Sequence, residues 1–381
     1  MNNIEAYLDN AATTQIFKEV NKYMFEIQRD VFGNPSSRHT LGSASEKLIN
    51  RSREVISKKL DVTSKEVFFT ASATEANNLA ILGYLKRNPR AGRHIICSEI
   101  EHPSVLNVYE MLSQNGYEVD RIKTDSSGQI DLDHLNSLVR IDTALVSVMF
   151  VNNETGAIQP IRRISEVIKE INLNVVFHVD AVQGFCKLDF SVKKLGVDLA
   201  TISAHKIHGP KGIGALYVRK GVKVSPIIFG GGQEYGLRSG TENVSAIAGF
   251  GKTVELLDKE ISNNISMVRE LRGKFIDKLA KELVLNSFDD GSPYILNISF
   301  PGIKSEVMLH HLESEGIYIS SGSACASNRN TQSHVLKSMG VAKAVSDSAI
   351  RISFSELNTH EEVMFAAEKI NYFLNKLGRS K

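Results

Sequence analysis

Short apolar runs rich in β-branched residues alternate with longer amphipathic stretches from residue 66 to about residue 230. The stretch 73–88, for example, has apolar positions that recur every three or four residues, as in a helix. Apolar runs flanked by such helices are typical of strands in a parallel sheet that is covered on both faces. The expected strands are EVFFT (66–70), HIICS (94–98), ALVSVMFV (144–151), VVFHVD (175–180), LATIS (199–203) and GALYVR (214–219). The pattern therefore predicts an α/β fold with a mostly parallel sheet.

After residue 240 the pattern changes to long charged helices, such as the stretch 245–284. A small α+β region follows, and the segment near 360–377 is expected to be the last helix. The strands expected in this region are YILNISF (294–300), IYISSG (317–322) and AIRISF (349–354). We therefore predict a domain boundary near 255–262, since 381 residues correspond to two or three domains of roughly 150 residues each.

The composition narrows the class of protein and of partner. Hydrophobic residues make up 42% of the chain and charged residues 23%, which is typical of a soluble globular protein and excludes a disordered or fibrous chain. The formal net charge of +2 is too small for nucleic acid or an acidic membrane surface to be the main partner. We expect a cytoplasmic protein, because the apolar runs are too short to span a membrane and MNNIEAYLDN does not resemble a signal peptide.

The chain has three cysteines and no CxxC pair, which argues against a disulfide framework and against a zinc site. We predict no metal site. Cys97 lies in an apolar strand and Cys186 follows Phe185, so both are expected to be buried. Cys325 lies among small residues in SSGSACAS (320–327), where either an accessible loop presents a reactive thiolate or a linker holds an incidental cysteine.

Polar residues follow several predicted strands at the point where each strand ends. Lys206 lies in SAHKIHGPKGIGALYVR (203–219), between two histidines and before a glycine-rich turn. It is either a solvated loop lysine or, if desolvated, a residue that forms Schiff bases, with Ser203, His205 and the loop amides suited to an anion. Asp180, at the end of VVFHVD, either caps a turn or pairs with a protonated pyridine nitrogen.

Two further motifs lie at the same edge of the predicted sheet. Thr74, in ASATEANN (71–78), opens a helix and is either an ordinary cap residue or part of a phosphate site. His102, in EHPSVL (101–106), is either a structural histidine or one that stacks on a planar ring and moves protons. VNNETG (151–156) adds amide side chains. Because ligands of such sheets bind beyond the carboxyl ends of the strands, these residues are expected to form one site.

The motifs occur in an order that resembles the cysteine desulfurases of the NifS/IscS type, which are pyridoxal-phosphate enzymes of aminotransferase class V. Besides the motifs already quoted, the resemblance includes YLDNAATT (7–14), FGNPSSRH (32–39), ATEANNLAI (73–81), GGGQEYGLRSGTEN (230–243) and IRIS (350–353). It implies the pyridoxal-phosphate-dependent transferase fold type I, with a mostly parallel seven-stranded sheet. The implied large domain is 14–258, and the implied small α+β domain comprises 1–13 and 259–381 and carries the cysteine loop.

The resemblance also implies a role for each matching residue. Lys206 forms a Schiff base with pyridoxal 5'-phosphate, Asp180 pairs with the pyridine nitrogen, and His102 stacks on the ring and exchanges protons. Arg351 binds the substrate carboxylate, and Cys325 receives the sulfur. The other implied contacts are those of Asn153 and Gln183 with the ring oxygen and the substrate, and those of Thr74, Ser203, His205 and, from the other subunit of a homodimer, Thr241 with the phosphate.

The implied reaction converts L-cysteine to L-alanine and leaves a persulfide on Cys325 for a sulfur-acceptor protein, with no direct contact to nucleic acid. Iron–sulfur cluster assembly, tRNA thiolation and DNA phosphorothioation remain open as destinations of the sulfur. The alternatives are a selenocysteine lyase, another class V aminotransferase, or a non-catalytic sulfur-relay scaffold. The cysteine in SGSAC argues against a transaminase, which needs no thiol.

Some positions differ from the family's pattern. Ser72 replaces a glycine before ATE, Tyr235 replaces a basic residue in GGGQExG, and RISFSELNT (351–359), which includes Ser355, lacks a glycine. NRNTQSHVL (328–336) lacks the usual leucine, glutamate and proline after the cysteine. These differences bear on the identity of the sulfur acceptor more than on the reaction, because the residues with implied catalytic roles are all present.

Overall fold

The computed structural model describes residues 4–279, 283–321 and 332–378. Its large sheet has seven strands in the order β2-β8-β7-β6-β5-β3-β4. Strand β8 runs antiparallel to β2 and β7, between which it lies, and all other pairs in this sheet are parallel. This confirms the prediction of a mostly parallel sheet. The strands are β2 (Val67–Thr70), β3 (His94–Ser98), β4 (Glu118–Ile122), β5 (Thr143–Met149), β6 (Val176–Asp180), β7 (Leu199–Ser203) and β8 (Gly214–Val218).

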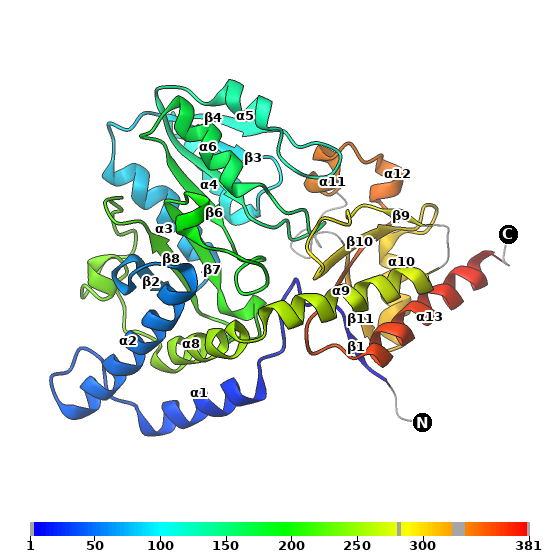
Figure 1. Ribbon diagram of the computed structural model, residues 1–381, viewed down its shortest axis with the longest axis horizontal. Coiled ribbons are helices and arrows are strands. Elements are labelled where there is room, and N and C mark those ends of the chain that lie inside the picture. The colour runs from blue at the N-terminus through cyan, green and yellow to red at the C-terminus, as the bar shows by residue number, and fades with distance from the viewer. Residues whose placement is uncertain (1–3, 280–282, 322–331, 379–381) are drawn as a thin grey trace.

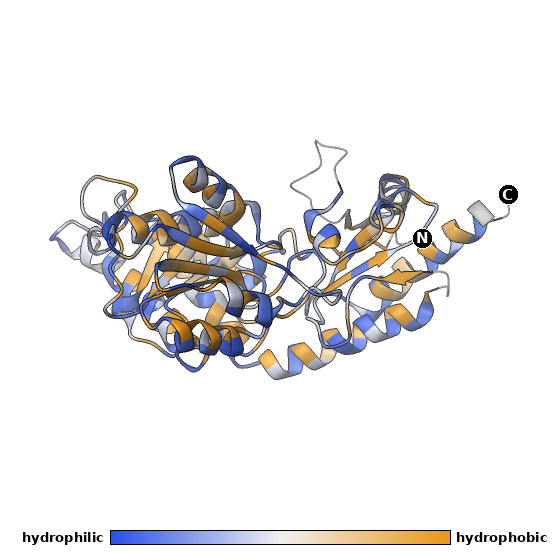
Figure 2. Cartoon of the chain, turned by 90° about the horizontal axis from the view of Figure 1, so that it is seen from above, coloured by the Kyte–Doolittle hydropathy of each residue, from blue (hydrophilic) through white to orange (hydrophobic). Residues whose placement is uncertain are grey.

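Helices cover both faces of this sheet (Figures 1 and 2). Successive strand residues alternate between two apolar clusters; Leu199, for example, packs with α3 and α4, whereas Ala200 belongs to the cluster on the opposite face. The strands in Figure 2 are largely hydrophobic, as expected for a sheet that is buried on both sides. The helices of this region are α1 (Lys18–Asp30), α2 (Thr40–Leu60), α3 (Ala73–Arg87), α4 (Pro103–Gln114), α5 (Leu132–Leu138), α6 (Ile161–Ile171), α7 (Val192–Leu195) and α8 (Val244–Asp258).

A second sheet, with strand order β12-β13-β10-β9, lies beyond the end of the large sheet (Figure 1). The first strand of the chain, β1 (Ala6–Tyr7), pairs in parallel with β11 (Ile317–Tyr318), so both ends of the chain contribute to this region. Its other strands are β9 (Val284–Leu285), β10 (Ile295–Ser299), β12 (Ser320–Ser321) and β13 (Ala349–Ser353). Its helices are α9 (Ile261–Lys278), α10 (Ser305–Ser314), α11 (His334–Ser338), α12 (Lys343–Ser346) and α13 (His360–Gly378).

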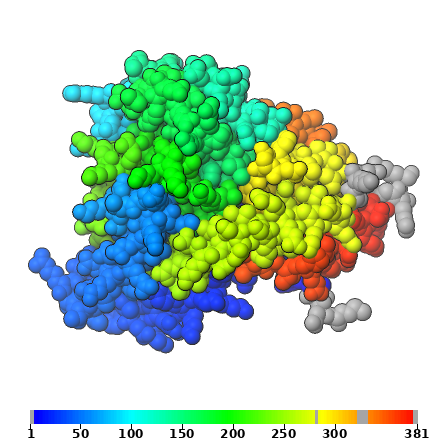
Figure 3. Space-filling model, in the orientation of Figure 1, coloured from blue at the N-terminus to red at the C-terminus, as the bar shows by residue number. Residues whose placement is uncertain are grey.

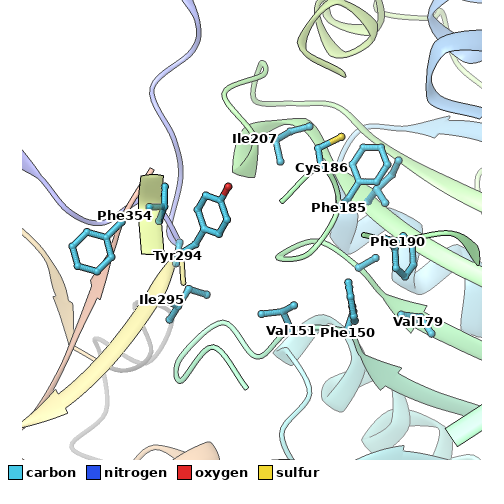
Figure 4. Packing of buried hydrophobic residues seen from close by; sticks show 14 of the residues in the cluster. Phe150, Val151, Val179, Phe185, Cys186, Phe190, Ile207, Tyr294, Ile295 and Phe354 are labelled. Carbon is cyan, nitrogen blue, oxygen red and sulfur yellow. The ribbon is translucent and has the colours of Figure 1, made fainter. Parts of the chain in front are cut away.

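The two sheet regions share one apolar core. Tyr294, Ile295 and Phe354 from the small-sheet region lie in the same cluster as Phe150 and Phe185 from the large-sheet region (Figure 4). In the space-filling view, the yellow-green surface that contains α8 and α9 extends across both regions (Figure 3). Helix α8 ends at Asp258 and α9 runs from Ile261 to Lys278, so the part of the charged stretch up to Lys278 forms two helices, and Val284, predicted to be helical, begins β9.

Cys97 and Cys186 are both buried and unpaired, as predicted. Burial raises the pKa of each thiol above its ordinary value, so neither is a reactive thiolate near neutral pH. Among the helices that the structure describes, none combines the length and the apolar character needed to cross a membrane.

Candidate active site

The predicted site residues meet at one edge of the large sheet. His102 caps α4 just beyond β3, Asp180 ends β6, and Ser203 ends β7, directly before the short helix η2 (Ala204–Lys206). The charges of Asp180 and Lys206 both act on His102, so these three residues lie close enough to influence one another. They lie at the carboxyl ends of parallel strands, which is where ligands of such sheets bind.

The Lys206 ammonium group is held by the N-terminal segment. Its Nζ donates hydrogen bonds to the carbonyl oxygens of Ala11, at 2.6 Å, and Ala12, at 2.8 Å. Gln183 Nε2 donates to the same Ala11 oxygen at 2.9 Å. The first residues of the chain therefore form one wall of the site, although they are distant in sequence from η2.

Asp180 is 5% exposed and accepts two hydrogen bonds. Its Oδ1 accepts from the Val182 backbone N–H at 3.1 Å, and its Oδ2 accepts from Asn77 Nδ2 at 2.8 Å. A buried carboxylate with two donors has a fixed orientation and can present charge to a cationic partner. Asn77 lies inside α3 and within the motif ASATEANN, in which only Thr74 was predicted to be a site residue.

His102 is half-buried; its Nδ1 accepts from the Ser104 backbone N–H at 3.1 Å and lies 2.8 Å from Ser104 Oγ. Burial lowers the pKa of His102 below its ordinary value; Asp180 opposes this change, whereas Lys206 and His334 add to it. The imidazole is therefore neutral near neutral pH. Ser104, like Asn77, was not predicted, although it lies two residues after His102 in the EHPSVL motif.

The residues predicted to bind phosphate surround the start of α3 and the end of β7. Thr74 is exposed in the first turn of α3, and Ser203 Oγ is buried with no hydrogen-bond partner among the described residues. Burial, with Lys206 and Lys211, lowers the pKa of His205 to about 4, so this ring is neutral. Thr241 is exposed. These groups are donors or neutral rings, and the start of a helix favours an anion.

Arg351 lies in the centre of the small sheet and is 2% exposed. Its Nη2 donates to Asp9 Oδ1 at 2.8 Å, and its Nη1 donates to the backbone carbonyl of Asn153 at 3.0 Å. The Asn153 contact is thus made by the main chain, whereas the resemblance implies a role for its side chain. Asp9 is a further residue that the sequence did not single out, although it lies in the YLDNAATT motif.

Glu101 is a second carboxyl group next to the site. Burial raises its pKa to about 8, and Asp180 adds to this rise. Its Oε1 accepts hydrogen bonds from Ser98 Oγ and from the Met149 backbone N–H at 2.7 Å. Glu101 is therefore largely protonated near neutral pH. The only sequence signal was its position directly before His102.

The positions that differ from the family's pattern have local structural explanations. Ser72 is the N-cap of α3, and its Oγ accepts from the Glu75 backbone N–H at 3.1 Å. The ring of Tyr235 lies 5.2 Å from the guanidinium carbon of Arg53, although Tyr235 has a left-handed φ of 57°. Ser355 is buried, and its backbone N–H donates to Asn358 Oδ1 at 2.9 Å.

The chemistry of these residues fits pyridoxal phosphate. A lysine, a buried carboxylate and a set of anion-binding groups meet there, and the buried atoms Gln183 Oε1, Ser203 Oγ and Arg351 Nε have no partner among the described residues. Within that part of the chain, no group of three or more His, Cys, Asp or Glu residues could hold a metal ion. Cys325 lies outside the described residues, so its role stays a prediction.

Comparisons with known proteins give a consistent result. The model of the family Aminotransferase class-V matches residues 6–365. The cysteine desulfurase IscS of Dictyoglomus turgidum is 41% identical over 377 residues, which cover 98% of this chain and 95% of that protein.

Two solved structures are similar over nearly the whole chain. A NifS-like protein has a TM-score of 0.93 and 39% identity, with 98% of this chain and 100% of that chain covered. SspA in complex with cysteine has a TM-score of 0.83 and 36% identity, with 93% of this chain and 100% of that chain covered. These similarities confirm the predicted fold type.

Proposed function

We propose, from the premise that the chain belongs to the aminotransferase class-V family, that it is a pyridoxal-phosphate-dependent cysteine desulfurase. The observation that carries this proposal is the convergence of Lys206, Asp180 and His102 at one sheet edge, in a chain 41% identical to a cysteine desulfurase over 98% of its length. The substrate is L-cysteine and the products are L-alanine and a protein-bound persulfide.

The cofactor, when bound, withdraws electrons from the Cα of an amino-acid substrate. Lys206 would hold the cofactor covalently. Without the cofactor its amine donates to the Ala11 and Ala12 carbonyls, so these two oxygens lie beside the nitrogen that would form the Schiff base. Asp180 stabilises a protonated pyridine nitrogen, since its carboxylate is already oriented by two donors. Gln183 and Asn153 contact the ring oxygen and the substrate.

The phosphate is held at the start of α3 by Thr74, Ser203 and His205. The unpartnered Ser203 hydroxyl supports this assignment, because a buried donor without a partner is costly. Thr241 reaches the phosphate of the second subunit in a homodimer. The exposure of Thr241, and of the nearby Phe229 at 71%, supports a surface that is covered by another chain.

Arg351 binds the substrate carboxylate with its guanidinium fork. The Cys325 thiolate then attacks the substrate sulfur. The carbon–sulfur bond of cysteine breaks and a sulfur–sulfur bond forms on Cys325. The carbon keeps the electron pair of the broken bond and takes up a proton to become the methyl group of alanine. The persulfide passes to a sulfur-acceptor protein, and we propose no specific pathway for it.

The chain is divided into a large domain, 14–258, and a small domain of 1–13 and 259–381. The pairing of β1 with β11 supports the assignment of the first residues to the small domain. The break between α8 and α9 supports a boundary near residue 258.

The test is an assay of alanine and sulfide formed from L-cysteine by the holoenzyme in the presence of a thiol reductant. The wild-type protein should form both products in equal amounts, and Cys325→Ala should form neither while it retains the cofactor absorbance. Transamination that survives in Cys325→Ala, with no desulfuration by the wild-type protein, would overturn the proposal. A wild-type protein with no cofactor absorbance after addition of pyridoxal phosphate would indicate a sulfur-relay scaffold instead.

A further inference from the structure

A continuous chain of hydrogen bonds links Asp180 to His102 through two residues without an assigned role. Asn77 Nδ2 donates to Asp180 Oδ2 at 2.8 Å and to Ser104 Oγ at 2.8 Å. Ser104 Oγ lies 2.8 Å from His102 Nδ1, and the Ser104 backbone N–H donates to the same ring nitrogen at 3.1 Å. The chain joins three elements, β6, α3 and α4, in the interior of the large-sheet region.

The direction of each bond in this chain follows from Asp180. A carboxylate only accepts hydrogen bonds, so the Asn77 amide must turn its nitrogen toward Asp180. The reverse orientation would place the amide oxygen against the carboxylate oxygen. Asn77 is fully buried, and its Oδ1 has no partner among the described residues, so nothing in that region favours the reverse orientation.

The remaining proton positions follow in turn. Asn77 Nδ2 has two hydrogens, and the second goes to Ser104 Oγ. The Ser104 backbone N–H donates to His102 Nδ1, so this nitrogen is an acceptor, and the Ser104 hydroxyl, whose oxygen accepts from Asn77, directs its own hydrogen to the same nitrogen. His102 Nδ1 then faces two donors, the Ser104 hydroxyl and the Ser104 backbone N–H. A ring nitrogen that faces two donors carries no hydrogen in the neutral imidazole.

We propose that Asn77 and Ser104 are positioning residues that fix neutral His102 in the tautomer with its hydrogen on Nε2. His102 is then a hydrogen-bond donor at Nε2 and not a proton acceptor at that atom. The alternative tautomer would place an N–H group against two other donors. This inference rests on the proposed function for its relevance to catalysis, but the tautomer itself is a property of the chain.

The direct test is magic-angle-spinning ¹⁵N NMR of the holoenzyme with selectively labelled histidine. The signal of His102, one of 11 histidines, is assigned by its loss in His102→Gln. In the wild-type protein, Nε2 should have the shift of a protonated nitrogen and Nδ1 that of an unprotonated one. A hydrogen on Nδ1 in the wild-type protein would overturn the proposal.

Two variants test whether the hydrogen bonds from Asn77 to Ser104 and from Ser104 to His102, which we call the relay, set the tautomer of His102. Asn77→Ala frees the Ser104 hydroxyl to accept from Nδ1, and Ser104→Ala leaves only the backbone N–H of residue 104 facing Nδ1, so both should raise the population with the hydrogen on Nδ1 above that of the wild-type protein. Ser104→Thr keeps the hydroxyl and should keep the wild-type spectrum. Asn78→Ala is the matched control on the same helix, because Asn78 donates only to the carbonyl of Thr74 in its own helix. An unchanged His102 spectrum in both alanine variants would contradict the relay.

Kinetics give a second readout. Ser104→Ala should lower kcat for L-cysteine about tenfold, as for the loss of roughly one hydrogen bond, and change KM less. The charged or titratable groups that act on His102 are Asp180, Lys206 and His334, so spectra and rates are compared at one pH where the cofactor absorbance of all variants is the same. A wild-type protein with the Nε2–H tautomer but no desulfuration would refute the proposed function and leave the tautomer assignment intact.

Discussion

Arg351 is held from two sides within the small sheet. Asp9 neutralises its charge at 2.8 Å, and the Asn153 carbonyl accepts from its other terminal nitrogen. A guanidinium group with two fixed contacts presents its remaining donors in one plane, which suits a carboxylate ligand. A lysine has the same charge but lacks this planar fork.

Arg351→Lys should therefore raise the KM for L-cysteine about tenfold or more and change kcat less, because one hydrogen bond to the carboxylate and the anchoring contact are lost. Steady-state kinetics measure both constants. Arg272→Lys is the matched control, since Arg272 is also buried in the small-sheet region but contacts the Phe288 carbonyl at 3.3 Å. Equal changes in the two variants would show that the effect comes from packing and not from substrate binding.

Glu101 gives a prediction about stability and pH. Its pKa is about 8 in the folded protein because of burial, against an ordinary value of 4.5. Between these values the folded protein keeps a proton that the unfolded chain releases. The contribution of Glu101 to the free energy of unfolding therefore falls as the pH rises between these two values, by up to about 1.4 kcal/mol per pH unit.

Glu101→Gln should remove this contribution, because the amide stays neutral in both states. Urea unfolding at several pH values between 5 and 8 gives the free energy of unfolding of both proteins. The value for the variant minus that for the wild-type protein, at each pH, measures this contribution. This difference should increase as the pH rises, because only the wild-type protein loses stability through Glu101. Glu110→Gln, which alters an exposed carboxylate, should follow the wild-type curve. A constant difference for Glu101→Gln would mean that Glu101 is ionised in the folded protein.

The site residues that could be predicted from the sequence are those that follow apolar strands. Lys206, Asp180 and His102 were found because strand ends are visible as local patterns. Asn77 belongs to the quoted motif ASATEANN, but its role was missed because its bond to Asp180 spans 103 positions and the motif does not show which of its side chains is buried against β6. The family resemblance, not the spacing of residues, supplied the roles of Arg351 and Thr241.

Helix α3 begins unusually close to strand β8. An added Cβ at Gly214 would lie 2.8 Å from the backbone carbon of Ser72 and 2.9 Å from the backbone nitrogen of Ala73. No side chain fits between these two segments unless one of them moves. The start of α3, where the phosphate is proposed to bind, therefore depends on a glycine in the neighbouring strand.

Gly214→Ala should displace the start of α3 and lower the affinity for pyridoxal phosphate, with a stability loss of about 1–3 kcal/mol from overpacking. Cofactor titration by absorbance and thermal unfolding of the protein without cofactor measure the two effects. Gly273→Ala, in helix α9, has no heavy atom within 4 Å of the added Cβ and should leave cofactor affinity unchanged. If Gly214→Ala bound pyridoxal phosphate with wild-type affinity, the phosphate would not bind at the start of α3.

The elements that the sequence predicted well are the buried ones. The apolar runs of the large sheet became strands with small shifts at their ends, because a strand covered on both faces must be apolar throughout. Strand β4 was missed, since it is the edge strand of its sheet and contains Glu118, Asp120 and Arg121. Strand β9 was missed because it has only two residues and the predicted helical stretch 245–284 extends into it.

The whole molecule depends on contacts between distant parts of the chain. The carbonyls of Ala11 and Ala12 accept from Lys206, and Asp9 pairs with Arg351. The N-terminal segment thus lies between the two sheet regions and contacts a charged residue of each. Such contacts could not be predicted from hydrophobic periodicity, which reports which face of an element is buried but not its partner.

The proposed homodimer predicts complementation between two defective variants. Lys206→Ala lacks the residue that holds the cofactor, and Thr241→Ala lacks the phosphate contact proposed to come from the second subunit. In a mixed dimer, the site of the Thr241→Ala subunit has its own Lys206 and receives Thr241 from its partner, so that site is complete. The other site of the mixed dimer lacks both residues.

Random exchange of subunits in an equal mixture should therefore restore about a quarter of the wild-type sites, because half of the dimers are mixed and each has one complete site. Alanine formation, measured at a pyridoxal-phosphate concentration too low to load Thr241→Ala alone, reports this recovery. A mixture of Lys206→Ala with Cys97→Ser, which keeps Thr241, is the control for subunit exchange. If Thr241 served its own subunit, both sites of the mixed dimer would be defective, and the mixture would be no more active than its components.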